Sequence, residues 1–132
     1  MSPILWIAII AVLAAAGFLF LISRKKKHLS SGEEAYIRNQ WRMIGQGHNP
    51  KNDILEADKL LDFALGKYGF QGTLGEKLKK AEKLFSDKNG VWFAHKMRNR
   101  FAHELDFEPS EFEFRKALES FHKALIDLKI KL

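Results

Sequence analysis

The sequence has no cysteine and only three prolines among its 132 residues. Without cysteine, the chain has neither disulfide bonds nor thiolate ligands for a metal, which is typical of a domain that faces a reducing cytoplasm. The scarcity of proline leaves long stretches free to form helices. These two absences favour an intracellular, helix-rich domain.

The sequence also lacks the short motifs of several large enzyme classes. It contains no GxxxxGK[ST] phosphate loop, no GxGxxG dinucleotide motif, no HExxH zinc motif and no Gly-x-Ser-x-Gly nucleophile turn. Gly66, Gly69, Gly72 and Gly75 are evenly spaced, but no basic residue stands where a phosphate loop requires one. We interpret these glycines as helix ends and loops, and we expect no cofactor and no metal.

Charge is absent from residues 3–22, PILWIAIIAVLAAAGFLFLI. Twenty helical residues span roughly 30 Å, which is about the thickness of the hydrocarbon core of a bilayer. The alternative is a cleaved signal peptide, which has basic residues before a shorter apolar core and small residues after it. Here the basic residues follow the core, and Ala14, Ala15 and Ala16 lie inside it. We therefore predict an uncleaved single-pass anchor over residues 1–23.

Most of the net charge of +6 lies directly after this anchor, at Arg24, Lys25, Lys26 and Lys27. The remaining 18 basic residues nearly balance the 16 acidic residues, so charge alone does not indicate nucleic-acid binding. Basic residues stay on the cytoplasmic side of a membrane, which predicts a cell-membrane protein with its N-terminus outside and its C-terminal domain in the cytoplasm. We expect the basic linker, residues 24–32, to contact anionic lipid.

The rest of the chain, residues 33–132, shows helical periodicity and no sustained alternation of apolar and polar residues. Asn49, Thr73 and Ser110 are suitable N-caps for three of its helices. The predicted fold class is all-α: a transmembrane helix followed by a compact antiparallel bundle of about five helices. The predicted helices cover residues 33–47, 49–69, 73–85, 88–102 and a stretch that begins at residue 110.

The fourth of these helices has two distinct faces. At 100° per residue, Phe93, Met97 and Phe101 fall on one side and should pack into the bundle. His95, Asn99 and His103 follow one another at intervals of four residues on a second side, which Arg98 flanks. Solvated helix faces are usually rich in Lys and Glu, so this composition indicates an interface or a site.

The order Arg98-Asn99-Arg100-Phe101-Ala102-His103, within HKMRNRFAHE, resembles the Arg-x4–6-His motif of HEPN domains. The family also places this motif on a late helix of an all-α bundle. The resemblance implies a metal-independent endoribonuclease of the stress, toxin–antitoxin or defence type, which acts on RNA as a homodimer through the Arg98/His103 face. It assigns catalysis to Arg98 and His103, and phosphate or substrate binding to Asn99 and His95.

Other interpretations of the same residues stay open. Arg98 can pair with Asp58 or Glu104 and join helices, and His103 can cap the end of its helix. A zinc site on His95 and His103 is disfavoured, because eight helical residues separate them by about 12 Å.

Two further functions are also open. Some HEPN domains are inactive, so the alternative is a non-catalytic, membrane-tethered module that dimerises or docks a protein partner. A third hypothesis is an RNA or nucleotide binder in which Arg98 and Lys96 bind phosphate without turnover.

Overall fold

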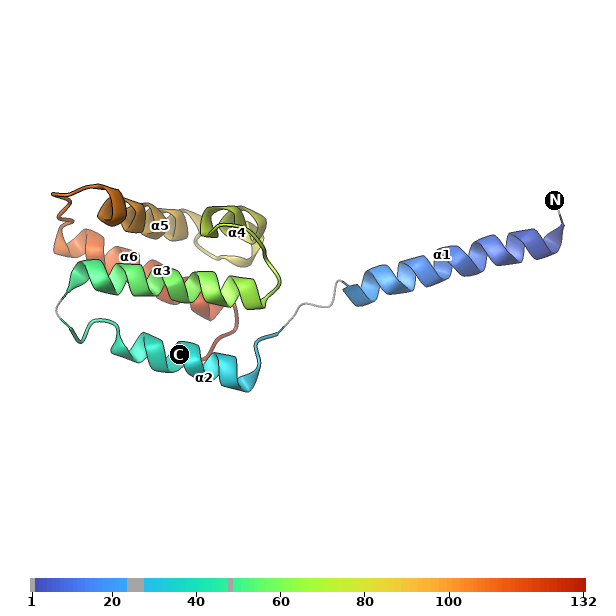
Figure 1. Cartoon of the computed structure of the whole chain (residues 1–132), viewed down its shortest axis with the longest axis horizontal. Helices are drawn as coiled ribbons and strands as arrows, with labels where there is room; N and C mark the ends of the chain where they lie inside the picture. The colour runs from blue at the N-terminus through green and yellow to red at the C-terminus, as the bar shows by residue number, and fades with distance from the viewer. Residues whose placement is uncertain (1, 24–27, 48) are drawn as a thin grey trace.

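We describe the protein from a computed structural model, which describes residues 2–23, 28–47 and 49–132. The described residues form helices and no strand, in agreement with the predicted all-α class. The predicted lipid-contacting residues Arg24, Lys25, Lys26 and Lys27 lie outside the described ranges. The elements are α1 (Pro3–Ser23), α2 (Ser31–Met43), α3 (Pro50–Lys67), α4 (Leu74–Lys80), a short 3-10 helix (Glu82–Leu84), α5 (Lys88–His103) and α6 (Glu111–Asp127) (Figure 1).

Helix α1 is long and apolar enough to cross a membrane: 19 of its residues, Pro3–Leu21, have a mean hydropathy of 2.8. None of these residues is buried by the rest of the protein. Side chains such as Ile4, Trp6 and Phe18 are therefore exposed to the surroundings, where an apolar medium would stabilise them.

The helix boundaries follow capping residues. The side chains of Asn49, Thr73 and Ser110 each accept a hydrogen bond from a backbone N–H three residues later, at 3.1 to 3.2 Å, as the sequence predicts. Helix α2 starts at Ser31, two residues before its predicted start, because Ser30 caps it by accepting from the Glu33 N–H. The third predicted helix breaks after Lys80 into α4 and the 3-10 helix.

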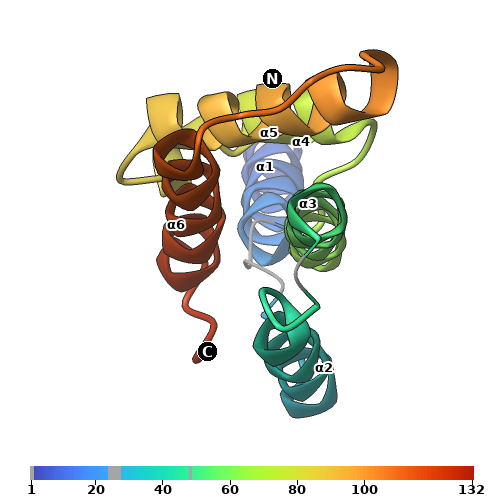
Figure 2. The same ribbon diagram turned by 90° about the vertical axis from the view of Figure 1, so that its left-hand side faces the viewer.

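Helices α3, α5 and α6 pack against one another and form the centre of the bundle. Helix α5 lies across α3 and α6, whereas α2 packs on the far side of α3 (Figure 2). The core-facing stripe of α3 is buried as predicted, and Tyr68 at its end donates a hydrogen bond to the Leu128 carbonyl. Gly69 follows with φ 96°, a conformation that glycine adopts without a steric penalty.

The C-terminal residues fasten α2 to the bundle. Arg38 Nε donates to the Lys131 carbonyl at 2.7 Å, and the Lys131 N–H donates to the Glu34 carboxylate at 2.9 Å. Ile130 is buried beside them in the core. Helix α5 does not take part in this contact. It buries one face against α3 and α6 and directs the other face outward.

Candidate functional site

Helix α5 carries the predicted site residues on a face set by its own apolar stripe. Asp87 caps the helix, and its carboxylate accepts from the Gly90 N–H at 3.0 Å. The buried side of the helix then holds Val91, Ala94, Met97 and Phe101. Because these positions face α3 and α6, the remaining polar positions lie at the edge of the bundle or in solvent.

Asp58 on α3 brings two of the predicted residues together. One carboxylate oxygen lies 3.0 Å from His95 Nδ1, and the other lies 3.4 Å from Arg98 Nε. The Asp58 side chain is only 8% exposed, against 13% for His95 and 37% for Arg98. A buried carboxylate requires such partners. We call Asp58, His95, Arg98 and Asn99 the polar cluster.

An opening of about 380 Å³ lies over the polar cluster, between α3, α5 and the start of α4. Arg98 and Asn99 reach it from α5, and the Arg98 guanidinium also donates to the Asn99 side-chain oxygen at 3.3 Å. A β-carbon added at Gly75 would lie 3.8 Å from His95 Nε2, so this nitrogen is directed toward α4. Part of the Arg98 charge stays accessible from the opening.

His103 lies apart from the polar cluster. It is the last residue of α5, it is exposed, and it does not line the opening. Five residues along a helix correspond to a rotation of about 140° and a rise of about 7.5 Å, so Arg98 and His103 leave different sides of α5. Asn99 lies between them in rotation. One chain therefore brings together His95, Arg98 and Asn99, but not His103.

The structure distinguishes between the alternative partners of Arg98. Arg98 pairs with Asp58, whereas Glu104 pairs with Arg100 at 2.9 Å. Asp62, one turn after Asp58, pairs with Lys77 of α4 at 2.7 Å. In the described part of the chain no three His, Asp or Glu side chains gather closely enough to hold a metal ion.

The contact between Asp58 and His95 orients the imidazole for proton transfer. When Nδ1 carries the imidazole proton, it donates a hydrogen bond to the Asp58 carboxylate, and Nε2 is left as a proton acceptor. The neighbouring guanidinium of Arg98 supplies positive charge for a phosphate or carboxylate. The ring of Trp92 packs edge-on to His95, with centroids 6.0 Å apart, and limits its movement. These groups suit the binding of an anion and the transfer of a proton.

The sequence identified Asp58 only as a candidate partner of Arg98, and not as a buried residue that also contacts His95. A signal for its burial is present, because Asp58 stands four residues after Ile54 and three before Leu61, which are both buried. Asp53 is also buried, although the apolar stripe of α3 predicts burial for its neighbour Ile54 and not for Asp53. A carboxylate at a helical interval from buried apolar residues is thus the feature that points to Asp58.

No protein-family model matches this chain, and neither the curated proteins nor the solved structures include a significant match. The HEPN resemblance therefore depends on the six-residue motif and on the order of the helices.

Proposed function

We propose that this protein is a membrane-anchored, HEPN-like, metal-independent endoribonuclease that acts as a homodimer. The observation that carries the proposal is that the Arg98 guanidinium is both held by a buried carboxylate and partly accessible. Buried Asp58 holds one edge of its guanidinium, and the rest reaches an opening that also exposes Asn99 and is large enough for a phosphate group. An arginine fixed in this way is ready to bind an anion without losing much side-chain freedom.

The position of His103 supports the requirement for a second copy. Arg98 and His103 leave different sides of α5, so one chain does not direct both at one phosphate. A two-fold axis beside this face would bring two copies of each residue together. The His103 side chain is exposed and, within the described residues, makes no hydrogen bond or ion pair, so its imidazole is available to a partner subunit or to substrate.

The chemistry follows from these groups. A proton acceptor takes the proton of an RNA 2′-hydroxyl, and the 2′-oxygen forms a bond to phosphorus. The bond from phosphorus to the 5′-oxygen breaks, and that oxygen receives a proton from an acid. We assign the proton transfers to His103, stabilisation of the phosphorane charge to Arg98, phosphate binding to Asn99, and substrate binding to His95, whose Nε2 can accept a hydrogen bond from a hydroxyl group. The products are a 2′,3′-cyclic phosphate and a 5′-hydroxyl.

The anchor has a role in the same proposal. Helix α1 spans the cell membrane with the N-terminus outside, and residues 24–27 contact anionic lipid on the cytoplasmic side. Confinement to a membrane raises the effective concentration of the bundle and so promotes pairing of two copies.

The test uses the full chain in lipid nanodiscs, incubated with a labelled single-stranded RNA in excess EDTA. We expect the parent to cleave the RNA and to leave cyclic phosphate ends. Arg98→Ala and His103→Ala should each reduce the cleavage rate at least about a hundredfold. Arg115→Ala and His122→Ala are matched controls, because both residues are exposed on α6 and neither belongs to the polar cluster. Equal cleavage by the parent and by either site variant would refute the assignment.

A second function is favoured by one observation: Asp58 contacts both His95 and Arg98, so the polar cluster is partly closed by its own charges. Such a cluster suits a non-catalytic, membrane-tethered module that dimerises or docks a protein partner. Intact RNA, together with a dimer that Arg98→Ala dissociates, would select this second function.

A further inference from the structure

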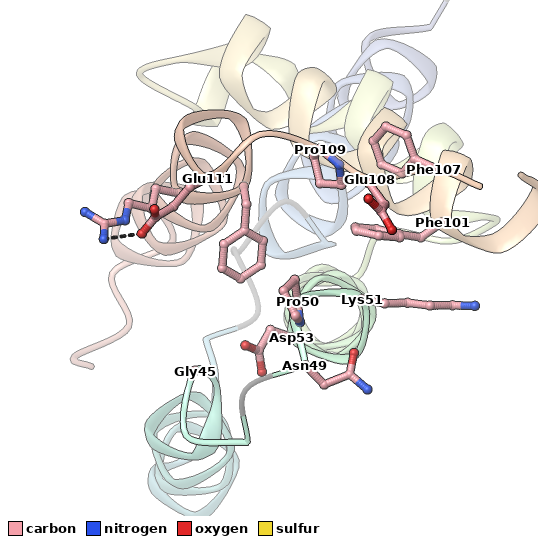
Figure 3. A pocket seen from close by; sticks show the side chains of 12 residues that line it. Gly45, Asn49, Pro50, Lys51, Asp53, Phe101, Phe107, Glu108, Pro109 and Glu111 are labelled. Atoms are coloured by element: carbon pink, nitrogen blue, oxygen red, sulfur yellow. Dashed lines mark hydrogen bonds and ion pairs between the residues drawn. The ribbon is translucent and has the colours of Figure 1, made fainter. Parts of the chain in front are cut away.

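A second, larger cavity of about 860 Å³ lies where α3 begins, between α3, the end of α5 and the start of α6. Among the described residues, it shares no lining residue with the opening over the polar cluster. Figure 3 shows Asp53 projecting from α3 toward Gly45, while Phe101, Phe107 and Glu108 come from the opposite wall. We call this cavity the Asp53 pocket.

Asp53 is the unusual group in this pocket. The residue is 6% exposed, and within the described part of the chain its carboxylate has no hydrogen-bond or ion-pair partner. Its backbone N–H donates to the Asn49 carbonyl, so the side chain is not needed to close the first turn of α3. No side-chain oxygen in the described part of the chain is both sealed from solvent and without a partner, so the Asp53 carboxylate still touches solvent although most of the residue is covered. A cation or a hydrogen-bond donor that enters from the solvent side can therefore pair with it. Asp53 lines this pocket and also a smaller opening of about 210 Å³ between α2 and α3, and the larger of the two has room for an organic ligand.

The walls of the Asp53 pocket are aromatic and fixed. The rings of Phe101 and Phe107 meet edge to face with centroids 4.8 Å apart, and Phe114 adds a third ring from α6. The Arg100 guanidinium lies 4.0 Å from the centre of the Phe107 ring and holds it in place. Aromatic faces attract both hydrocarbon and organic cations.

The other charged side chains at the rim differ in whether they are paired and in whether they face the pocket. Glu111 is paired with Arg115 at 2.5 Å, which neutralises both. Lys51 extends into solvent, away from Asp53 (Figure 3). Glu108 is exposed at the rim without a partner in the described residues, so it provides a second anionic group near the entrance.

We propose that the Asp53 pocket binds an aliphatic amine in its ammonium form, and that a diamine binds best. One ammonium group would pair with Asp53, the alkyl chain would pack on the phenylalanine rings, and the second ammonium group would reach Glu108. A hydrogen bond between an ammonium group and a carboxylate is charge-assisted and roughly twice as strong as one between neutral groups. The cavity volume lies in the range of small-molecule sites. This inference is independent of the proposed ribonuclease activity.

The experiment is calorimetric titration of the full chain in zwitterionic nanodiscs, which do not attract amines by surface charge. The probes are 1,5-diaminopentane, n-pentylamine and the uncharged 1,5-pentanediol. We expect the diamine to bind most tightly, the monoamine to bind more weakly and the diol not to bind. Asp53→Asn keeps the shape of the side chain and should weaken both amines by at least about tenfold.

Two further variants complete the test. Glu108→Gln, on the exposed rim, should weaken the diamine but leave the monoamine unchanged, whereas Glu119→Gln, an exposed carboxylate on α6 outside the pocket, should change neither. Equal binding of the diamine and the diol by the parent would overturn the proposal, as would unchanged amine affinity in a folded Asp53→Asn variant. If circular dichroism shows that Asp53→Asn does not fold, unchanged diamine affinity in Glu108→Gln overturns it instead.

Discussion

Replacing Asp58 by alanine removes a buried carboxylate that contacts both His95 and Arg98. The two contacts differ in environment. His95 Nδ1 is 3.0 Å from the carboxylate and is nearly as buried as Asp58, whereas Arg98 is partly exposed and its contact is longer, at 3.4 Å. The variant therefore leaves a buried ring nitrogen without its partner, while the guanidinium can turn toward water.

The magnitude follows from these environments. An unsatisfied buried polar group costs about 1 to 3 kcal/mol. The pair with Arg98 is screened by solvent and adds at most about 1 kcal/mol. We therefore expect Asp58→Ala to lower the free energy of unfolding by about 1 to 4 kcal/mol, with most of the loss arising at His95. Asp58→Asn keeps an acceptor for His95 and should cost about 1 kcal/mol.

Urea unfolding of the full chain in nanodiscs, followed by the fluorescence of Trp41 and Trp92, measures these differences. Glu56→Ala is the control, because Glu56 also lies on α3 and pairs with Lys59, but on the exposed surface. It should change stability by no more than about 0.5 kcal/mol. If Asp58→Ala were no more destabilising than Glu56→Ala, Asp58 would not organise the polar cluster as its burial and distances indicate.

Two further predictions concern the core and the C-terminal contact. Leu61→Ala, at 0% exposure, should cost about 2 to 5 kcal/mol in urea unfolding, whereas Leu105→Ala, at 102% exposure, should cost almost nothing; similar values for both would contradict the assignment of the core. Burial, and then the Glu34 carboxylate, raise the pKa of Tyr68 above its usual 10.0, so its contribution to stability is complete below that pH and is lost as the pH rises through the folded-state pKa. Tyr68→Phe should therefore be less stable than the parent by about 1 kcal/mol at neutral pH, because the hydrogen bond to the Leu128 carbonyl is lost. Thermal unfolding across this alkaline range should show the difference shrinking, and a constant difference would refute the role of the hydroxyl.

Local sequence was sufficient for most of the helices and for much of the core. Capping by Asn49, Thr73 and Ser110 depends on residues three positions apart, so the chain specifies it without tertiary structure. The apolar stripes, such as Ile54 and Leu61 on α3, are likewise visible as a repeat of three and four residues. The length and lack of charge of α1 are properties of composition alone.

The sites depend on contacts that no local pattern contains. Asp58 and His95 are 37 residues apart, and they meet because α5 lies across α3. The Asp53 pocket is assembled from the start of α3, the end of α5 and the start of α6, which are separate in the sequence. The positions of the helices and their apolar faces could be predicted from local sequence, because both properties arise from neighbours within one turn. The pairing of Asp58, and the lack of a partner for Asp53 among the described residues, follow from the tertiary structure, because pairing depends on which side chains other helices bring to each carboxylate.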